Sequence, residues 1–120
     1  MKKMSFEQFI GSDLRNAHIR EKGITIYVRR PTGYSHNANF ELATLDADRP
    51  GRGALTAFMD KYGDKYTFYV ENILEDRLVG FFQKRGYRII GEHIGDLDRC
   101  MISQQCHHYK DDIPARKMGF

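Results

Sequence analysis

The chain lacks the features that mark several large classes of protein. None of its apolar runs approaches the ~20 residues that a helix needs to cross a bilayer. Residues 6–9 (Phe-Glu-Gln-Phe) follow Lys2 and Lys3 where a secretory signal would place an apolar core. Only two cysteines, Cys100 and Cys106, occur among 120 residues, and a domain of this size can bury a core without disulfides. We therefore expect a cytoplasmic protein with free thiols and no membrane partner.

Charge is also too evenly balanced to define a partner. Nineteen Lys and Arg against 16 Asp and Glu give a net charge of +3, which does not by itself indicate nucleic-acid binding. Residues 1–35 are more basic, with seven basic and three acidic side chains: Lys2, Lys3, Arg15, Arg20, Lys22, Arg29 and Arg30 against Glu7, Asp13 and Glu21. An anionic partner and a solvated surface both explain this excess, and we favour the solvated surface.

A zinc site is not predicted. Cys100, Cys106, His107 and His108 supply enough ligands in number, but the spacing Cys-x₅-Cys-His-His matches no common zinc module. Unpaired surface histidines are the simpler interpretation.

The hydrophobic pattern predicts one α/β domain over residues 1–106 and a loose tail over 107–120. We expect a capping box between Ser5 and Gln8, and a second helical segment from Ser12 to Gly23. Further helices are expected at 53–62 and 72–86, and strands at 24–29, 39–47, 66–70, 87–93 and 99–104. The alternation of strands and helices in the middle of the chain indicates a mixed sheet covered by helices.

Two of these elements carry more detailed expectations. Alternation along 39–47 assigns three residues to each face: Phe40, Leu42 and Thr44 on one, Glu41, Ala43 and Leu45 on the other. Asn72 is placed to cap the helix that follows it, with Glu75 closing a capping box.

A glycine-rich turn is the first segment with a chemical meaning. Residues 49–56 (Arg-Pro-Gly-Arg-Gly-Ala-Leu-Thr) end a strand and open a helix, an arrangement whose backbone N–H groups bind phosphate. Arg49 and Arg52 add positive charge, and the Thr56 hydroxyl can add a hydrogen bond. Taken alone, the segment fits an ordinary tight turn equally well.

A second segment, residues 69–78 running on to 84–87, reads as a strand, a helix and a glycine stop. Together the two segments resemble the two acyl-CoA-binding segments of the GNAT family, the Gcn5-related N-acetyltransferases. Gly53 matches the first glycine of the family pattern Gln/Arg-x-x-Gly-x-Gly/Ala, whereas Pro50 and Leu55 depart from it.

Lys84, Gly86 and Tyr87 agree with the family's second pattern, and Phe82 stands where tyrosine is usual. The likeness covers residues 24–104 and is greatest to short, divergent members, some of them encoded by bacteriophages.

The resemblance implies a mostly antiparallel sheet with helices on both faces and a splayed pair of parallel strands. It implies acetyl-CoA or another acyl-CoA as cofactor, with its pyrophosphate on the turn and its pantetheine arm along the strand before it. The residues expected to bind the cofactor are Leu45, Asp46, Ala47, Arg49, Gly51, Arg52, Gly53, Ala54, Leu55, Thr56, Asn72 and Phe82.

The implied reaction is attack of an amine on the thioester, for which the amine must first lose a proton. Glu41 and Glu71 are the candidate bases, and Glu41 fits a solvent-facing strand residue equally well. Asn72 can bond the pantetheine or polarise the acyl carbonyl as well as cap a helix. In many family members the tyrosine is thought to protonate the leaving thiolate. Phe82 cannot, so another group or water does so, or activity is lost.

The acceptor is less constrained. Tyr27, Tyr34 and His36 could border it, although a surface position is the more common outcome for such a histidine. The N-terminal helices that usually wall the acceptor side are missing, which favours a large acceptor such as a protein amine or a nucleic-acid base. A monomer or a homodimer is expected. The alternative function is an inactive binding module that contacts a protein or nucleic acid through its basic N-terminal third, Arg29 and Arg30 included.

Overall fold

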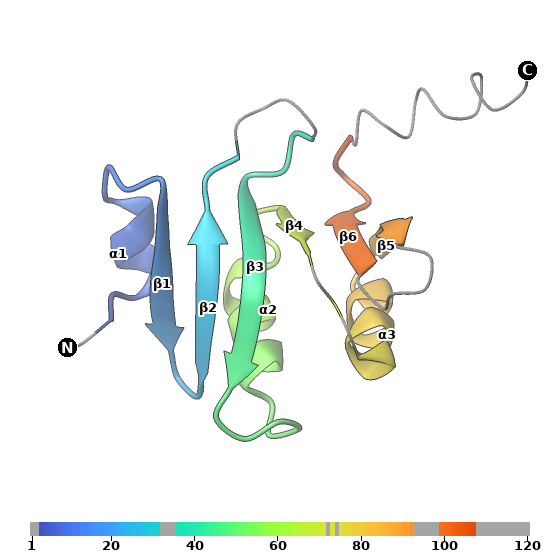
Figure 1. The fold of residues 1–120 in the computed structure, drawn as a ribbon, viewed down its shortest axis with the longest axis horizontal. Coiled ribbons are helices and arrows are strands. Elements are labelled where there is room, and N and C mark those ends of the chain that lie inside the picture. The colour runs from blue at the N-terminus through green and yellow to red at the C-terminus, as the bar shows by residue number, and fades with distance from the viewer. Residues whose placement is uncertain (1–2, 32–35, 72, 74, 93–98, 108–120) are drawn as a thin grey trace, which may run out of the picture.

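The computed structural model describes residues 3–31, 36–71, 73, 75–92 and 99–107, which contain six strands and three helices (Figure 1). The strands are β1 (Asn16–Glu21), β2 (Ile24–Arg29), β3 (Phe40–Ala47), β4 (Phe68–Val70), β5 (Tyr87–Glu92) and β6 (Arg99–Ser103). The helices are α1 (Phe6–Ile10), α2 (Ala54–Tyr62) and α3 (Asp76–Lys84). In this part of the chain no helix is long and apolar enough to cross a membrane.

The six strands form one mixed sheet in the order β1-β2-β3-β4-β6-β5. All neighbours are antiparallel except β3 and β4, which run parallel. The parallel pairing spans only three residue pairs, from Phe40–Phe68 to Leu42–Val70, whereas β3 continues to Ala47. The expected mixed, mostly antiparallel sheet is therefore confirmed, and the described pairing of its one parallel pair ends at Leu42 and Val70, so that β4 lies beside only the first part of β3 (Figure 1).

Local signals determine α1. Ser5 Oγ accepts a hydrogen bond from the Gln8 N–H at 3.1 Å, and Gln8 Oε1 accepts one from the Ser5 N–H at 2.8 Å, so the predicted capping box is confirmed. At the other end the Arg30 guanidinium donates to the carbonyls of Phe9 and Ile10 and lies 4.9 Å from the centre of the Phe9 ring. A short helix, unstable alone, is thus capped at its first turn and held at its last turn by Arg30, the residue that follows β2.

The helical segment expected between Ser12 and Gly23 is wrong, because residues 16–21 form β1. This strand pairs with β2 from Asn16–Arg29 to Glu21–Ile24 around the two-residue turn Lys22-Gly23. Gly23 has φ +81°, the left-handed conformation that tight hairpin turns require. The hairpin pairs residues 16–21 with β2 along their whole length, and this outweighs a weak helical spacing.

A β-bulge changes the faces of β3. Tyr27 pairs with Thr44 and Val28 with Leu42, so Ala43 is an extra residue. Beyond it the alternation reverses: Thr44 is exposed, whereas Leu45 and Ala47 pack against the core. The predicted faces of Thr44 and Leu45 are therefore wrong, and the bulge turns Leu45 toward the helices.

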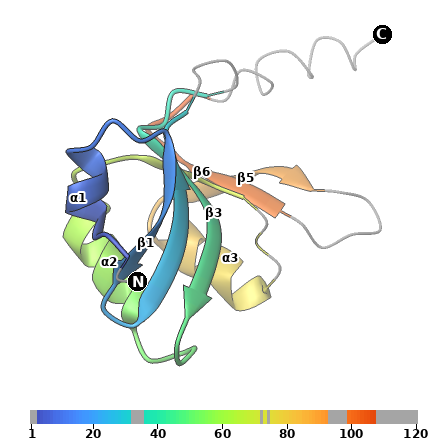
Figure 2. The ribbon, with the colours of Figure 1, turned by 60° about the vertical axis from the view of Figure 1, so that its left-hand side comes forward.

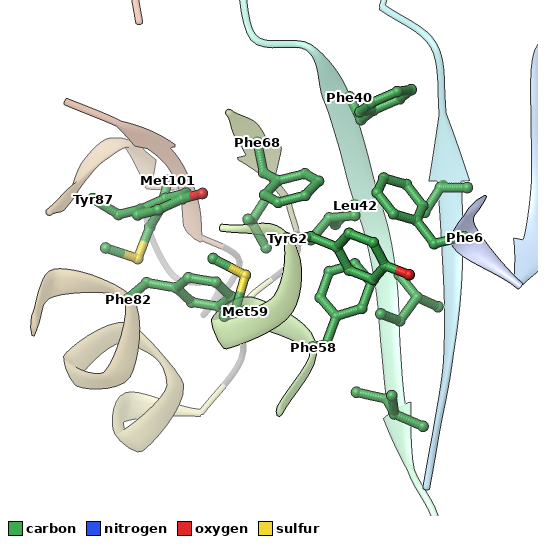
Figure 3. Close-up of a cluster of buried hydrophobic side chains, with 14 of the residues drawn as sticks. Phe6, Phe40, Leu42, Phe58, Met59, Tyr62, Phe68, Phe82, Tyr87 and Met101 are labelled. Carbon is green, nitrogen blue, oxygen red and sulfur yellow. The ribbon is translucent and has the colours of Figure 1, made fainter. Parts of the chain in front are cut away.

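All three helices cover one face of the sheet. Phe6 of α1, Met59 of α2 and Phe82 of α3 belong to one buried cluster with Leu42 and Met101 of the sheet (Figure 3). Figure 2 shows α1 and α2 on the same side of β1 and β3. The expectation of helices on both faces is thus wrong for the described residues.

The strand order explains this arrangement. The β3-α2-β4 and β4-α3-β5 connections cross the sheet in the same direction, and connections of this kind share one hand, so they place both helices on one face.

Phe6 is the centre of the core, and replacing it tests the packing of α1. It is 0% exposed, and its ring lies 4.8–6.5 Å from those of six aromatic neighbours: Phe9, Phe40, Phe58, Tyr62, Tyr66 and Phe68. We expect Phe6→Ala to lower the free energy of unfolding by ~3–5 kcal/mol through the cavity it leaves, as measured by urea denaturation. Leu14→Ala, at a side chain 45% exposed, should change it by less than ~0.5 kcal/mol. Equal effects would contradict this account of the core.

Candidate functional site

A cavity of about 340 Å³ lies at the end of β3, between the first turn of α2 and α3. It brings together the two segments that sequence analysis singled out. From the first come Leu45, Asp46, Ala47, Arg49, Gly51, Gly53, Ala54, Leu55 and Thr56, and from the second Glu75, Arg77, Leu78 and Phe81. Nine of the residues predicted to bind a cofactor therefore line one space.

The turn before α2 requires its glycines. Gly51 has φ +83° and Gly53 φ +84°, values that residues with a Cβ rarely adopt. Gly53 is the N-cap of α2, and neither a side-chain cap nor an acidic residue occupies its first turn. The N–H groups of that turn are thus left for another acceptor, at the end of the helix that attracts anions.

Three arginines surround this helix end. Arg49 and Arg77 line the cavity, and Arg52 lines an adjoining hollow of about 430 Å³ together with Lys22. Within the described ranges the side chains of Arg49 and Arg52 form no ion pair. Asp46, Asp48 and Glu75 also line the two hollows, so Lys22, Arg49, Arg52 and Arg77 leave an excess of one positive charge, which is placed at the helix end and suits a phosphate-bearing ligand.

Arg77 is a residue that sequence analysis missed. Its Nη1 lies 3.7 Å from the position that a Cβ on Gly51 would take, so it faces the turn from the opposite wall. Its Nε donates to Glu75 Oε2 at 2.6 Å. The signal in the sequence that could have identified it is its position as a basic residue in the first turn of α3, the helix that follows β4.

The start of α3 differs from expectation. Its N-cap is Glu75, without a side-chain cap, and the Glu75 carboxylate binds Arg77 instead, so the predicted capping box between Asn72 and Glu75 is wrong. Asn72 itself lies outside the described residues, so its predicted roles toward the pantetheine and the acyl carbonyl stay predictions.

Phe82 does not line the cavity. It is 0% exposed in the core, with its ring 5.3 Å from that of Tyr87, and the preceding residue, Phe81, lines the cavity instead. Successive residues of a helix point about 100° apart, so only one of this pair can face the cavity.

The two candidate bases come together at a single arginine. Arg29 Nε donates to Glu41 Oε1 at 3.0 Å, and its Nη2 donates to Glu71 Oε1. These side chains lie on the sheet face without helices, since Glu41 and Arg29 alternate with the core residues Leu42 and Val28. The Glu71 N–H bonds the Leu42 carbonyl at 3.1 Å, which places this residue where β3 and β4 part.

His36 completes this cluster, although a surface position was expected for it. It is 1% exposed, and its ring stacks on Tyr69 at 4.4 Å with an interplanar angle of 8°. Nδ1 accepts the Ala38 N–H at 3.2 Å, so Nε2 carries the proton and donates it to Glu41 Oε2 at 2.7 Å. This tautomer follows from the hydrogen bonds.

The surroundings of Glu41 stabilise its anion. Partial burial raises the pKa of this carboxyl, but the hydrogen bond from His36 and the charge of Arg29 outweigh it, so the pKa lies below its ordinary value. Conversely, burial raises the pKa of Tyr69, and Cys100 adds to this, so the phenol keeps its proton. Because Arg29 binds one oxygen of Glu41 and His36 binds the other, this carboxylate is a weak proton acceptor.

The other residues that sequence analysis considered do not belong to the cavity or to the Arg29 cluster. Arg30 holds α1, and Cys100 and Cys106 are free thiols. In the part of the chain that the structure describes, no three His, Cys, Asp or Glu side chains are grouped as a metal would require. His108 and Tyr34 lie outside that part.

In comparisons with known proteins, no protein-family model, no curated protein and no solved structure matches this chain.

Replacing Glu41 tests the electrostatics of the cluster. Because its folded pKa is depressed, the stability that it contributes is present above the ordinary value of 4.5 and is lost as the pH falls through the folded pKa. We expect Glu41→Gln to lower the free energy of unfolding by ~1–3 kcal/mol at pH 7, with a difference from wild type that shrinks toward pH 3. Urea denaturation across this range measures it. A difference that is the same at pH 7 and pH 3 would contradict the assignment.

Proposed function

We propose that this protein binds acetyl-CoA or another acyl-CoA and transfers its acyl group to an amine. The observation that carries the proposal is the cavity at the end of β3. There an uncapped helix end with two left-handed glycines meets Arg49 and Arg77, with Arg52 in the adjoining hollow, and an edge of β3 that pairs with no described strand. The resemblance of residues 49–56 and 69–87 to the acyl-CoA-binding segments of the GNAT family supports it.

The phosphates are assigned to the charged end of the site. The N–H groups of the first turn of α2 donate hydrogen bonds to the pyrophosphate, with Arg49 and Arg77 on either side. Coenzyme A carries a further phosphate on its ribose, and the adjoining hollow with Lys22 and Arg52 offers it positive charge. A ligand with several phosphates uses both hollows, since they share Arg49, Gly53 and Ala54.

The pantetheine arm is assigned to the strand edge. Beyond Leu42 the side of β3 that faces β4 pairs with no described strand, so its peptide groups are open to an extended ligand. Pantetheine carries two amides and can add to such an edge as a strand would. The apolar side chains of Leu45, Ala47 and Phe81 line the same cavity and suit its methylene and dimethyl groups.

The reacting thioester then lies where β3 and β4 part, close to Glu71. The amine approaches from the face without helices, where Glu41, Glu71 and Arg29 lie. No described helix covers this face, which supports a large acceptor such as an amine of another protein.

The alternative, an inactive module that binds a macromolecule through Arg29 and Arg30, has less support. Arg29 binds Glu41 and Glu71, and Arg30 binds the end of α1. Neither guanidinium is available to a phosphate backbone without breaking internal contacts.

Two glycines with the same strained backbone provide a matched test of the cavity. Gly53 and Gly86 have φ +84° and +87°, but only Gly53 lines the cavity. We expect Gly53→Ala to weaken acetyl-CoA binding about tenfold or more, ~1.4 kcal/mol, because its Cβ stands at the mouth of the anion site. Gly86→Ala should leave binding within about twofold of wild type. Calorimetry measures both, and no binding by the wild type at millimolar ligand would disprove the proposed function.

Arg77 provides a second test, because the structure alone points to it. Arg77→Gln should weaken binding of coenzyme A roughly five- to twentyfold by removing a charge-assisted hydrogen bond at a partly exposed position. Arg15→Gln, at an exposed arginine outside the cavity, should have little effect. The difference between the two variants should shrink as salt is raised, and equal affinities at low salt would remove Arg77 from the site.

A further inference from the structure

The Arg29 cluster contains two carboxylates in unequal situations. Glu41 has both oxygens engaged, one by Arg29 and one by His36. Glu71 has one oxygen on Arg29, and its second oxygen has no partner in the described part of the chain. The side chains of Glu41 and Glu71 are 17% and 23% exposed, so exposure does not separate them; hydrogen bonding does.

From this inequality we infer that Glu71 alone takes the proton of the acceptor amine, and that His36, Glu41 and Arg29 are positioning residues that hold Glu71 in place. The inference rests on the proposed transferase function and deepens it. It also limits the acceptor to an amine that arrives as a cation. The two carboxylates and one guanidinium leave one negative charge at this point, which attracts an ammonium group.

The chain of contacts gives each positioning residue a separate task. His36 is buried and anchored to the Ala38 N–H, so its Nε2–H occupies the outer oxygen of Glu41. Glu41 in turn accepts the Nε–H of Arg29 and fixes the plane of the guanidinium. That leaves Nη2 directed at Glu71, as a planar guanidinium presents its donors in fixed directions.

The backbone around Glu71 is fixed as well. Its N–H bonds the Leu42 carbonyl at 3.1 Å, and two residues later the Ile73 N–H bonds the Arg99 carbonyl at 2.9 Å. The residue is therefore held between β3 and β6 at the point where the parallel strands part. A base must be placed in this way to act on an amine next to the thioester.

The proton balance closes without a further acid. The acceptor R–NH₃⁺ gives one proton to Glu71 and attacks the thioester carbon as R–NH₂, forming the C–N bond. As the C–S bond breaks, the second proton passes from nitrogen to the leaving thiolate, which departs as the free thiol of coenzyme A. Glu71 then releases its proton to water, and Phe82, buried in the core, takes no part.

Transfer from acetyl-CoA to two probe amines, a blocked lysine peptide and spermidine, tests the inference by thiol release. We expect Glu71→Gln to lower kcat by ~100-fold or more, with the affinity for acetyl-CoA by calorimetry within about twofold of wild type. Glu41→Gln and His36→Gln should lower kcat by about tenfold or less, because Glu71 remains and only its placement loosens. Arg29→Lys, which keeps the charge but not the two-sided bridge, should retain more activity than Arg29→Gln.

The matched control is Asp60→Asn, which removes another carboxylate paired with an arginine, Arg85, on the outer side of α2. It should leave kcat unchanged. Turnover that falls as far with Glu41→Gln as with Glu71→Gln, or that survives Glu71→Gln within tenfold, would overturn the inference and leave the transferase standing. Acetyl-CoA that does not bind, or that binds without acetylating either probe, counts against the proposed transferase and the inference with it.

Discussion

The early parting of β3 and β4 is the constraint on which the site depends. β2 pairs with β3 as far as Ala47, whereas β4 ends at Val70 and pairs with β6 on its other side. The two strands can therefore share only three residue pairs. Beyond them the side of β3 that faces β4 pairs with no described strand, the cavity lies on the helix side, and Glu71 is held at the junction. One break in the sheet thus creates both halves of the candidate site.

The Arg29 cluster shows how two carboxylates coexist in a half-buried place. Two carboxylates that share one arginine repel each other, and partial burial increases the free-energy cost of ionising each of them. Arg29 offsets the repulsion by binding both, and His36 adds a donor to Glu41 alone. Glu41 therefore accepts hydrogen bonds from two side chains and Glu71 from one in the described part of the chain. A second donor on Glu71 would have made a more stable surface but would have left no carboxylate oxygen free.

Sequence was informative where the determining contacts are local. The capping box of α1, the buried stripe of Phe58, Met59 and Tyr62 in α2, and the glycine turn before it follow from residues within a few positions of one another. The predictions were wrong where the structure depends on contacts between residues far apart in the sequence. β1 forms because β2 pairs with it, and the bulge at Ala43 arises from a register that no local pattern records.

The same distinction separates the predicted site residues from the missed ones. Leu45–Thr56 is a continuous segment, so one motif found most of one wall. Arg77 of α3 faces Gly51, and His36, which lies between β2 and β3, is buried by the stacked ring of Tyr69 in β4. Glu41 and Glu71 were each named from the chain, but their unequal hydrogen bonding depends on Arg29 and His36 together.

The position of Phe82 in the structure changes the interpretation of this residue. The resemblance to the GNAT family would place a tyrosine at this position, and its absence was the main reason to consider an inactive module. Yet the Phe82 ring packs with Tyr87 in the core, and Phe81 lines the cavity in its place. A hydroxyl at position 82 would be buried among apolar rings, where an unpaired polar group is costly. Phenylalanine is therefore explained by packing, and its presence is no evidence that chemistry has been lost. The question of activity then turns on the groups at the parting of β3 and β4.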